Sequence, residues 1–214
     1  MIEIFRHHRL TIHLSDIAGG LPADPRLVDA WQEANWRKSA KLLPGDPADS
    51  AEAAQRTGEL LEGIPEEKGF TVFPRGPGGV LCIEGRQVKA ALKESANILR
   101  QLVPVGTPKK VVPLRSKLAE RVFVVERLLP FTPETTEPDD VIERAIHVMT
   151  AQGPRDAIKR SEIVKGRDLI CTLKVLNDGL FTHEVLGTLL EHMAENGLGA
   201  DRSQGFGRFT YELE

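Results

Sequence analysis

Four glycines within eleven residues near the carboxyl end form a loop whose composition suits the binding of an anion. The loop contains Gly197, Gly199, Gly205 and Gly207, together with Arg202, Ser203 and Arg208. Glycine tolerates positive φ angles and lets another chain approach the backbone without a Cβ in the way. Unblocked N–H groups and guanidinium charge can therefore meet a phosphate here. The alternative is structural: a glycine that ends a helix, followed by a bulge before an edge strand.

A second group of cationic side chains lies at the start of a predicted helix. Gly85 precedes this helix, which we expect from about residue 86 to residue 102, with Arg86, Lys89 and Lys93 on its exposed face. Backbone N–H groups at a helix N-terminus favour phosphate for electrostatic reasons, and nearby cations add to this. The pattern therefore predicts a second anion site, although a run of charges is also typical of a solvated surface.

Histidines near the amino terminus could carry acid–base chemistry. His7, His8 and His13 form the only local cluster among the six histidines of the sequence. An imidazole suits proton transfer near neutral pH, so His7 and His13 are candidates for a catalytic role. A metal site is not predicted, because His7 and His8 point to opposite faces of a strand and no further ligand lies at suitable spacing.

Residues 2–14 have the alternation of a strand that would position these histidines. One parity is apolar and comprises Ile2, Ile4, Leu10, Ile12 and Leu14, and the other comprises Phe5, His7, Arg9, Thr11 and His13. One apolar and one polar face are typical of an antiparallel sheet. An open sheet face with arginine, histidine and phenylalanine can hold unstacked bases, which favours Arg9 and His13 as base contacts. An ordinary solvated strand has the same pattern.

Turn signals divide the middle of the chain into short elements. We expect a loop over 16–25, helices over 25–37 and 50–62, strands over 69–75, 80–83 and 121–129, an irregular basic segment over 104–117 and an acidic loop over 131–140. The strands over 69–75 and 80–83 are predicted to form a hairpin across Gly76-Pro77-Gly78-Gly79.

The carboxyl third has the clearest pattern. Residues 142–150 and 157–164 predict a hairpin, and a turn at Gly166 leads to a strand over 168–176. Thr182 is the expected N-cap of a helix that ends at residue 196, with Gly197 as its left-handed stop. The Gly-rich loop then leads into a final strand. The helix and this strand therefore hold the loop from both sides.

The amino-acid sequence of the carboxyl segment resembles a motif of a known family. Residues 197–209 read Gly-x-Gly-x-x-x-Ser-x-Gly-Phe-Gly-Arg-Phe after a leucine-rich helix. This resembles the signature loop of the RAMP superfamily (repeat-associated mysterious proteins) of CRISPR systems, which are RNA-binding proteins. Residues 82–93 resemble the strand, turn and helix start of the same family, but with Arg86-Gln87 in place of small hydroxyl residues and Ala90 in place of a glycine.

The resemblance implies an α+β fold with a ferredoxin-like, RRM-like antiparallel sheet packed by helices. It implies one RAMP-like domain over 1–214 with insertions at about 38–68, which would be acidic and helical, and at about 104–140. It implies single-stranded RNA, either guide or target, as a partner, together with other ribonucleoprotein subunits or further copies of the chain. Target-cleaving members of the family use a loop aspartate, a place that Asp16 or Asp24 could fill.

The composition of the chain bears on whether it has disulfides, a metal site, a membrane segment or a cationic face. The chain has 214 residues, of which 41% are hydrophobic, and only two cysteines, so we expect a packed core with reduced, buried thiols and no cysteine-rich metal site. No apolar run reaches the ~18 residues that cross a bilayer, and the amino terminus does not read as a signal peptide, so a cytoplasmic protein without membrane partners or cofactors is expected. The net charge is −3, yet residues 85–130 contain ten basic and three acidic side chains, which suits a cationic face.

Three functions remain open from the sequence. The first is an RNA-binding subunit that holds phosphates through the Gly-rich loop and the helix start at Gly85. The second is a metal-independent endoribonuclease that uses a histidine to activate a 2′-OH. The third is an assembly module that has kept the fold and lost RNA, which the net acidity and the two helices expected over 25–37 and 50–62 would suit.

Overall fold

The computed structural model describes residues 3–23, 70–101, 114–150 and 153–214. The helices expected over 25–37 and 50–62 lie outside the described residues. The chain divides into two compact units. Unit 1 comprises Met1–Gly19, Phe73–Asp140 and Ile163–Glu214, and unit 2 comprises Gly20–Val72 and Val141–Glu162. The insertion bounds of 38–68 and 104–140 stay predictions.

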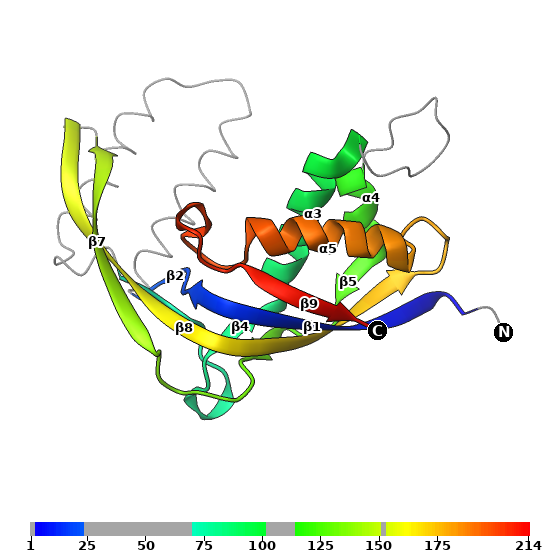
Figure 1. The fold of residues 1–214 in the computed structure, drawn as a ribbon, viewed down its shortest axis with the longest axis horizontal. Coiled ribbons are helices and arrows are strands. Elements are labelled where there is room, and N and C mark those ends of the chain that lie inside the picture. Colours follow the sequence, from blue (N-terminus) through cyan, green and yellow to red (C-terminus); the bar gives the residue numbers. More distant parts are fainter. Residues whose placement is uncertain (1–2, 24–69, 102–113, 151–152) are drawn as a thin grey trace, which may run out of the picture. The chain divides into compact units, whose positions relative to one another are not determined.

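Unit 1 is built on an antiparallel sheet with the strand order β5-β8-β1-β9. Its main elements along the chain are β1 (Phe5–Ala18), α3 (Gly85–Ile98), β5 (Val122–Val124), β8 (Gly153–Leu176, from Ile163 onward), α5 (His183–Asn196) and β9 (Phe209–Leu213). Helices α3 and α5 lie on the same side of this sheet (Figure 1). Two strand–helix–strand units interlocked in this order form the ferredoxin-like α+β fold, so the predicted fold class is confirmed.

Shorter elements complete unit 1. They are η2 (Pro77–Gly79), β4 (Cys82–Glu84), η3 (Leu99–Gln101), α4 (Leu114–Arg121), β6 (Leu128–Pro130) and η4 (Arg202–Gln204), of which η2, η3 and η4 are single turns of 3₁₀ helix. Strand β4 pairs with β6 in an antiparallel ladder, and α4 packs against α3. Strand β4 leads directly into α3, so this small ladder supports the amino-terminal end of that helix.

Unit 2 contains β2 (Leu21–Pro22), β3 (Phe70–Val72), β7 (Asp140–Thr150, from Val141 onward) and the first part of β8. Strand β3 pairs with β2 in antiparallel and with β8 in parallel orientation, and β7 pairs with β8. The hydroxyls of Thr71 and Ser161 lie 2.9 Å apart across the parallel pair. Strands β7 and β8 pair with each other, as the predicted hairpin requires, and both are longer than the sequence suggested.

The core of unit 1 follows the alternation of its strands and the stripe of its last helix. Leu10 and Ile12 on β1 are fully buried, and Leu14 is nearly so. The buried stripe of α5 comprises Leu186, Leu189, Leu190 and Met193. Ile4 departs from the prediction, because it precedes β1 and is 61% exposed. Period-two and period-3.6 patterns thus placed the core correctly in β1 and along most of α5, but they missed the buried Leu114 and Leu118 of α4.

Three local predictions were wrong. Residues Asp16 to Ala18, expected in a loop, continue β1. Arg115 and Lys117, expected in an irregular segment, belong to α4. Gly166 does not turn the chain, because β8 runs through it with a φ of 57° at this glycine. Pairing with β1 continues β8 across this position, since Asp16 pairs with Lys165 and Leu14 with Arg167 on the two sides of Gly166.

The predicted hairpin over 69–83 is confirmed at its turn only. The amide of Gly76 donates to the carbonyl of Val80 at 2.8 Å, and Arg75 and Leu81 form an antiparallel bridge. The strands on the two sides do not pair further, because β3 pairs with β2 and β8, whereas β4 pairs with β6.

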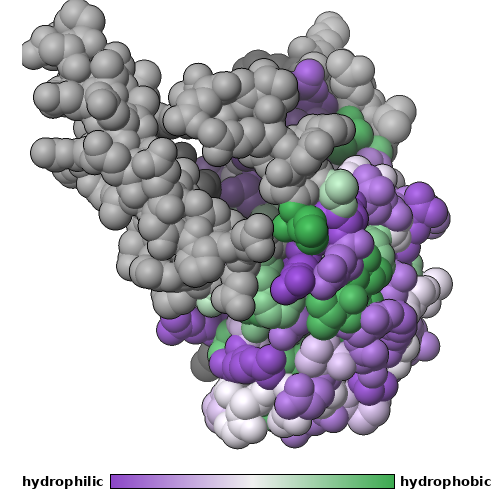
Figure 2. All heavy atoms as spheres, turned by 90° about the vertical axis from the view of Figure 1, so that its left-hand side faces the viewer, coloured by the Kyte–Doolittle hydropathy of each residue, from purple (hydrophilic) through white to green (hydrophobic). Residues whose placement is uncertain are grey.

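One face of the protein shows both polar and apolar residues. Figure 2 shows separate apolar areas with polar residues between them. The exposed large apolar side chains in the described part are Ile4, Ile98, Phe123, Val125, Val141, Ile158 and Ile170. Within that part of the chain, no helix has both the length and the apolar character needed to span a membrane.

Candidate nucleic-acid interface

The Gly-rich loop closes against the carboxyl end of β1. The amide of Ala200 donates to the carbonyl of Ala18 at 3.1 Å, and the amide of Gly207 donates to the carbonyl of Asp16 at 3.0 Å. Inside the loop, the amide of Leu198 donates to the carbonyl of Gly207 at 2.9 Å. These amides are engaged within the chain, so an anion at the loop would meet its side chains and its remaining amides.

Three of the four glycines are needed for close backbone packing. A Cβ at Gly207 would lie 1.8 Å from the carbonyl oxygen of Leu198, and Cβ atoms at Gly197 and Gly199 would lie 2.7 Å and 2.8 Å from backbone oxygens. Gly205 differs, because it has a φ of 96° and open space around it. Gly197 ends α5 with φ 82° and ψ 168°, which is a glycine conformation but not the left-handed helical stop that we expected.

The two arginines of the loop have different surroundings. The Nη1 atom of Arg202 lies 2.8 Å from Oε2 of Glu94 on α3. The hydrogen bond from Arg202 holds the pKa of Glu94 below its ordinary value, although burial opposes this. Arg208 is exposed, and the structure shows no ion pair for it within the described residues. Ser203 is also exposed. Arg208 is therefore the loop cation that is open to a ligand.

The side of the unit 1 sheet that faces away from α3 and α5 carries the polar parity of β1, and we call it the open face. The register pairs Arg9 with Thr172 and His13 with Asp168, while Glu212 on β9 pairs with Thr11. Arg208 directly precedes β9, and alternation from the buried Phe209 places it on this same side. The structure therefore brings Arg9, His13 and Arg208 to one surface.

His13 is held by a carboxylate. Its Nδ1 atom lies 2.8 Å from Oδ1 of Asp168, and its Nε2 atom lies 3.9 Å from Oε1 of Glu212. A carboxylate at one ring nitrogen fixes the orientation of an imidazole. His7 is exposed on the same strand, whereas Asp16 lies within β1 opposite Lys165 and not in a loop. Asp24 lies outside the described residues.

The helix start at Gly85 is more engaged than the sequence indicated. The amide of Gly85 donates to the carbonyl of Arg127 at 2.9 Å, and a Cβ there would lie 2.1 Å from the carbonyl oxygen of Glu126. Arg86 is exposed, and its Nε atom donates to Glu84 at 2.7 Å. Gly85 is therefore required for packing, and the guanidinium of Arg86 already has a carboxylate partner.

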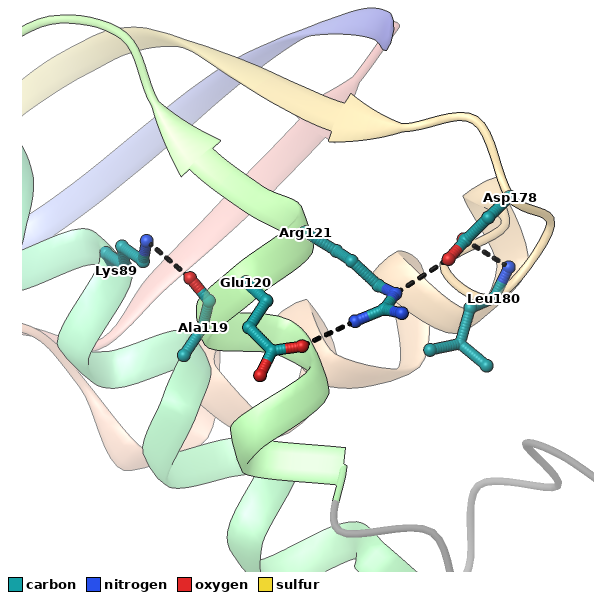
Figure 3. A network of polar contacts seen from close by, with 6 residues as sticks. All are labelled: Lys89, Ala119, Glu120, Arg121, Asp178 and Leu180. Carbon is teal, nitrogen blue, oxygen red and sulfur yellow. Dashed lines mark hydrogen bonds and ion pairs between the residues drawn. The ribbon is translucent and has the colours of Figure 1, made fainter. Parts of the chain in front are cut away.

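Lys89 and Lys93 follow on the same helix. The ammonium of Lys89 donates to the carbonyl of Ala119 at 3.0 Å, as Figure 3 shows, and lies 4.4 Å from the ring centroid of Phe123. Burial and the nearby charge of Lys93 hold the pKa of Lys89 below its ordinary value. Lys93 is half-buried. Lys89 thus lies at the β5 edge, whereas Lys93 precedes Glu94, the partner of Arg202 in the Gly-rich loop.

An aromatic cluster on the open face was missed in the sequence. The rings of Phe5 and Phe123 lie 6.3 Å apart in an edge-to-face arrangement, and the ammonium of Lys174 lies 4.3 Å from the centroid of Phe5. The polar parity of β1 already contained Phe5. Its partner could be found only from the register, which pairs Phe123 with Lys174 across β5 and β8.

A histidine pair lies at the other side of β1. The ring centroids of His8 and His183 are 5.8 Å apart, and His183 is the first residue of α5. Burial, with the neighbouring His183, lowers the pKa of His8. In the described part of the chain, no three histidine, cysteine or acidic side chains gather as metal ligands would.

Figure 3 also shows how the connection between β8 and α5 is anchored. Arg121, the last residue of α4, donates from Nε to Asp178 at 2.6 Å and from Nη1 to Glu120 at 2.9 Å. Asp178 in turn accepts from the amide of Leu180 at 3.1 Å. This network fixes the entry to α5 and with it the position of His183.

Comparisons with known proteins give a limited result. No family model and no curated protein matches the sequence. Among solved structures, the chain is similar to a chain of a Type III-B Cmr-beta complex bound to cognate target RNA, with 12% sequence identity and a TM-score of 0.47. The similarity covers 98% of this chain and 61% of that chain, so this chain spans about three fifths of its length. An identity and a TM-score this low assign no function.

Proposed function

We propose that unit 1 binds single-stranded RNA as a subunit of a RAMP-type ribonucleoprotein. The observation that carries the proposal is the position of Arg9, His13 and Arg208 on one open face of a ferredoxin-like sheet. Such sheets present side chains to the bases and backbone of an unpaired strand. The resemblance of residues 197–209 and 82–93 to RAMP segments supports RNA, guide or target, as the ligand.

The loop and the sheet have different roles in this proposal. Arg208 and the exposed Ser203 contact phosphate at the carboxyl end of β1, with Gly205 as the open glycine between them. Arg9 and His13 lie four residues apart along β1, about 13 Å, and follow the strand toward its amino end. Lys89 and Lys93 add positive charge along α3. Arg202 contributes when its bond to Glu94 is exchanged for one to phosphate.

Fluorescence anisotropy of a labelled single-stranded RNA tests the proposal. Affinity should fall steeply with salt, because phosphate binding releases counterions. Arg202→Ala combined with Arg208→Ala should weaken binding to every sequence by a similar factor. Arg160→Ala, which removes an arginine paired with Glu143 in unit 2, is the matched control. Absence of RNA binding at low salt would refute the proposal, and the assembly module would then be the remaining function.

The His13–Asp168 pair favours a second candidate, a metal-independent endoribonuclease. In such a reaction Nε2 of His13 accepts the proton of a 2′-OH, the 2′ oxygen attacks the adjacent phosphorus, and the 5′ oxygen leaves and takes a proton from water. The products are a 2′,3′-cyclic phosphate and a 5′-OH end. Shortened RNA that disappears with His13→Ala and with a 2′-deoxy substrate would support cleavage, and intact RNA after prolonged incubation would rule it out.

A further inference from the structure

We propose that Phe5, Phe123, Lys89 and Lys174, here called the Phe5–Phe123 cluster, form a nucleobase-stacking site for single-stranded RNA. The inference rests on the proposed function and deepens it. The Gly-rich loop and Arg208 offer contacts to phosphate, whereas this cluster offers contacts to bases. It lies at the amino end of β1, eleven residues or about 36 Å along the strand from Asp16 at the loop.

The register of three strands builds the cluster. Phe123 on β5 pairs with Lys174 on β8, which pairs with His7 on β1. Phe5 lies two residues before His7 and therefore on the same face. The two rings are 6.3 Å apart with an interplanar angle of 78°. Both aromatic side chains are thus fixed on rigid strands and not on a loop.

Other side chains of the protein cover only part of the surfaces of the two rings. Two rings have four faces, and the contacts with Lys89, with Lys174 and between the rings occupy at most three of them. Phe123 is 36% exposed, and the neighbouring Val125 on the same parity is 56% exposed. Exposed aromatic surface on a sheet face gains free energy when a flat apolar partner covers it.

Charge identifies the partner. The ammonium of Lys174 lies 4.3 Å from the ring centroid of Phe5, where the phosphate next to a stacked base can reach it. Arg9 continues this positive end of the open face, whereas Asp168 and Glu212 lie farther along it, beside His13 and Thr11. A strand of unpaired nucleotides offers both a π face and a negative charge at each unit, which fits aromatic rings flanked by lysines.

A carboxylate that follows Phe123 along the chain already has a partner in the protein. The Oε2 atom of Glu126 accepts the amide hydrogen of Thr172 at 2.8 Å, at the point where β8 continues past β5. This oxygen of Glu126 is therefore engaged by the backbone of the sheet.

The test compares full-chain variants on two labelled probes: an oligouridine and an oligonucleotide of the same length whose central residues are abasic. Phe123→Leu and Phe5→Leu keep apolar volume and remove the aromatic face. Each should weaken oligouridine binding about tenfold, which corresponds to about 1.4 kcal/mol, with little change on the abasic probe. Lys174→Gln should weaken the binding of both probes. It should also reduce the slope of log affinity against log salt concentration by about one.

Ile170→Ala is the control, because Ile170 lies on the same face of β8 and is 37% exposed. Unchanged oligouridine affinity in both leucine variants would overturn the stacking site while the wild-type affinity upholds the proposed function. The stacking site would also be overturned if the leucine variants lost equal affinity for both probes, or if Ile170→Ala lost as much oligouridine affinity as they do. A change in self-association with constant RNA affinity would assign the surface to a second copy of the chain. Absence of RNA binding by the wild type would refute the proposed function itself.

Discussion

The guanidinium of Arg202 donates to the carboxylate of Glu94, with Nη1 and Oε2 2.8 Å apart. This bond ties the Gly-rich loop to the middle of α3. A carboxylate oxygen and a phosphate oxygen are similar acceptors for arginine, so under the proposed function an RNA phosphate would compete with Glu94 for Arg202. Binding of phosphate by Arg202 therefore competes with a bond inside the protein.

The first prediction concerns this competition. Glu94→Gln removes the negative charge and keeps the size of the side chain, so RNA affinity should rise severalfold, since Arg202 is released and a charge that repels phosphate is gone. Anisotropy at fixed salt measures the change. Glu120→Gln is the control, because Glu120 pairs with Arg121 at the end of α4. Equal or lower affinity in Glu94→Gln would mean that Glu94 orients Arg202 and does not compete for it.

The second prediction separates the glycines of the loop. Gly207→Ala should lower the free energy of unfolding by at least about 2 kcal/mol, because the new Cβ would meet the carbonyl of Leu198 and the φ of 80° is strained for alanine. Gly205→Ala should cost only about 1 kcal/mol, since no atom lies near its Cβ position. Urea denaturation followed by circular dichroism gives both values. Similar losses at the two positions would contradict the packing described for Gly207.

The third prediction is a pH dependence from His8. Burial and His183 hold its pKa below the ordinary 6.5, so the folded state binds this proton less tightly than the unfolded state does. Stability should therefore be highest above pH 6.5 and fall as the pH decreases toward the folded pKa. His183→Gln should raise the pKa of His8 and reduce this fall, as NMR titration and melting curves at pH 8 and pH 5.5 would report. An unchanged His8 titration would contradict the pairing of the two rings.

The fourth prediction concerns the two thiols. Burial raises the pKa of Cys171 to about 12 and raises that of Cys82 as well. A thiol reacts as its thiolate, so neither cysteine should react with a disulfide reagent at pH 8 in the native protein, and both should react after denaturation. Absorbance of the released chromophore counts the reactive thiols. Rapid reaction of Cys171 in native buffer would contradict its place in the core.

Local patterns were sufficient for the framework of unit 1. The alternation of Leu10, Ile12 and Leu14 predicted β1, and Thr182 predicted the start of α5, where its hydroxyl accepts from the amide of Val185 at 3.3 Å. Helix α4 was not predicted because prolines such as Pro113, in the segment expected to be irregular over 104–117, are typical helix breakers. Proline is tolerated just before a first helical turn, and α4 begins at Leu114.

The candidate site was predictable only in part, because its partners come from distant segments. Arg9, His13 and Arg208 were found from sequence, but their common face depends on the pairing of β1 with β8 and β9. The bond between Arg202 and Glu94 joins residues 108 positions apart, and the contact of Phe5 with Phe123 crosses a third strand. No local pattern indicates such pairs.

Photocrosslinking tests the central claim most directly. Single-stranded RNA that contains 4-thiouridine would be irradiated with the full chain, and the crosslinked peptides would be identified by mass spectrometry. We expect crosslinks on the open face of unit 1, in β1 between Phe5 and His13 and in the segment around Arg208. Crosslinks confined to α3 and α5, on the opposite side of the sheet, or no crosslink to unit 1 at low salt, would contradict the claim.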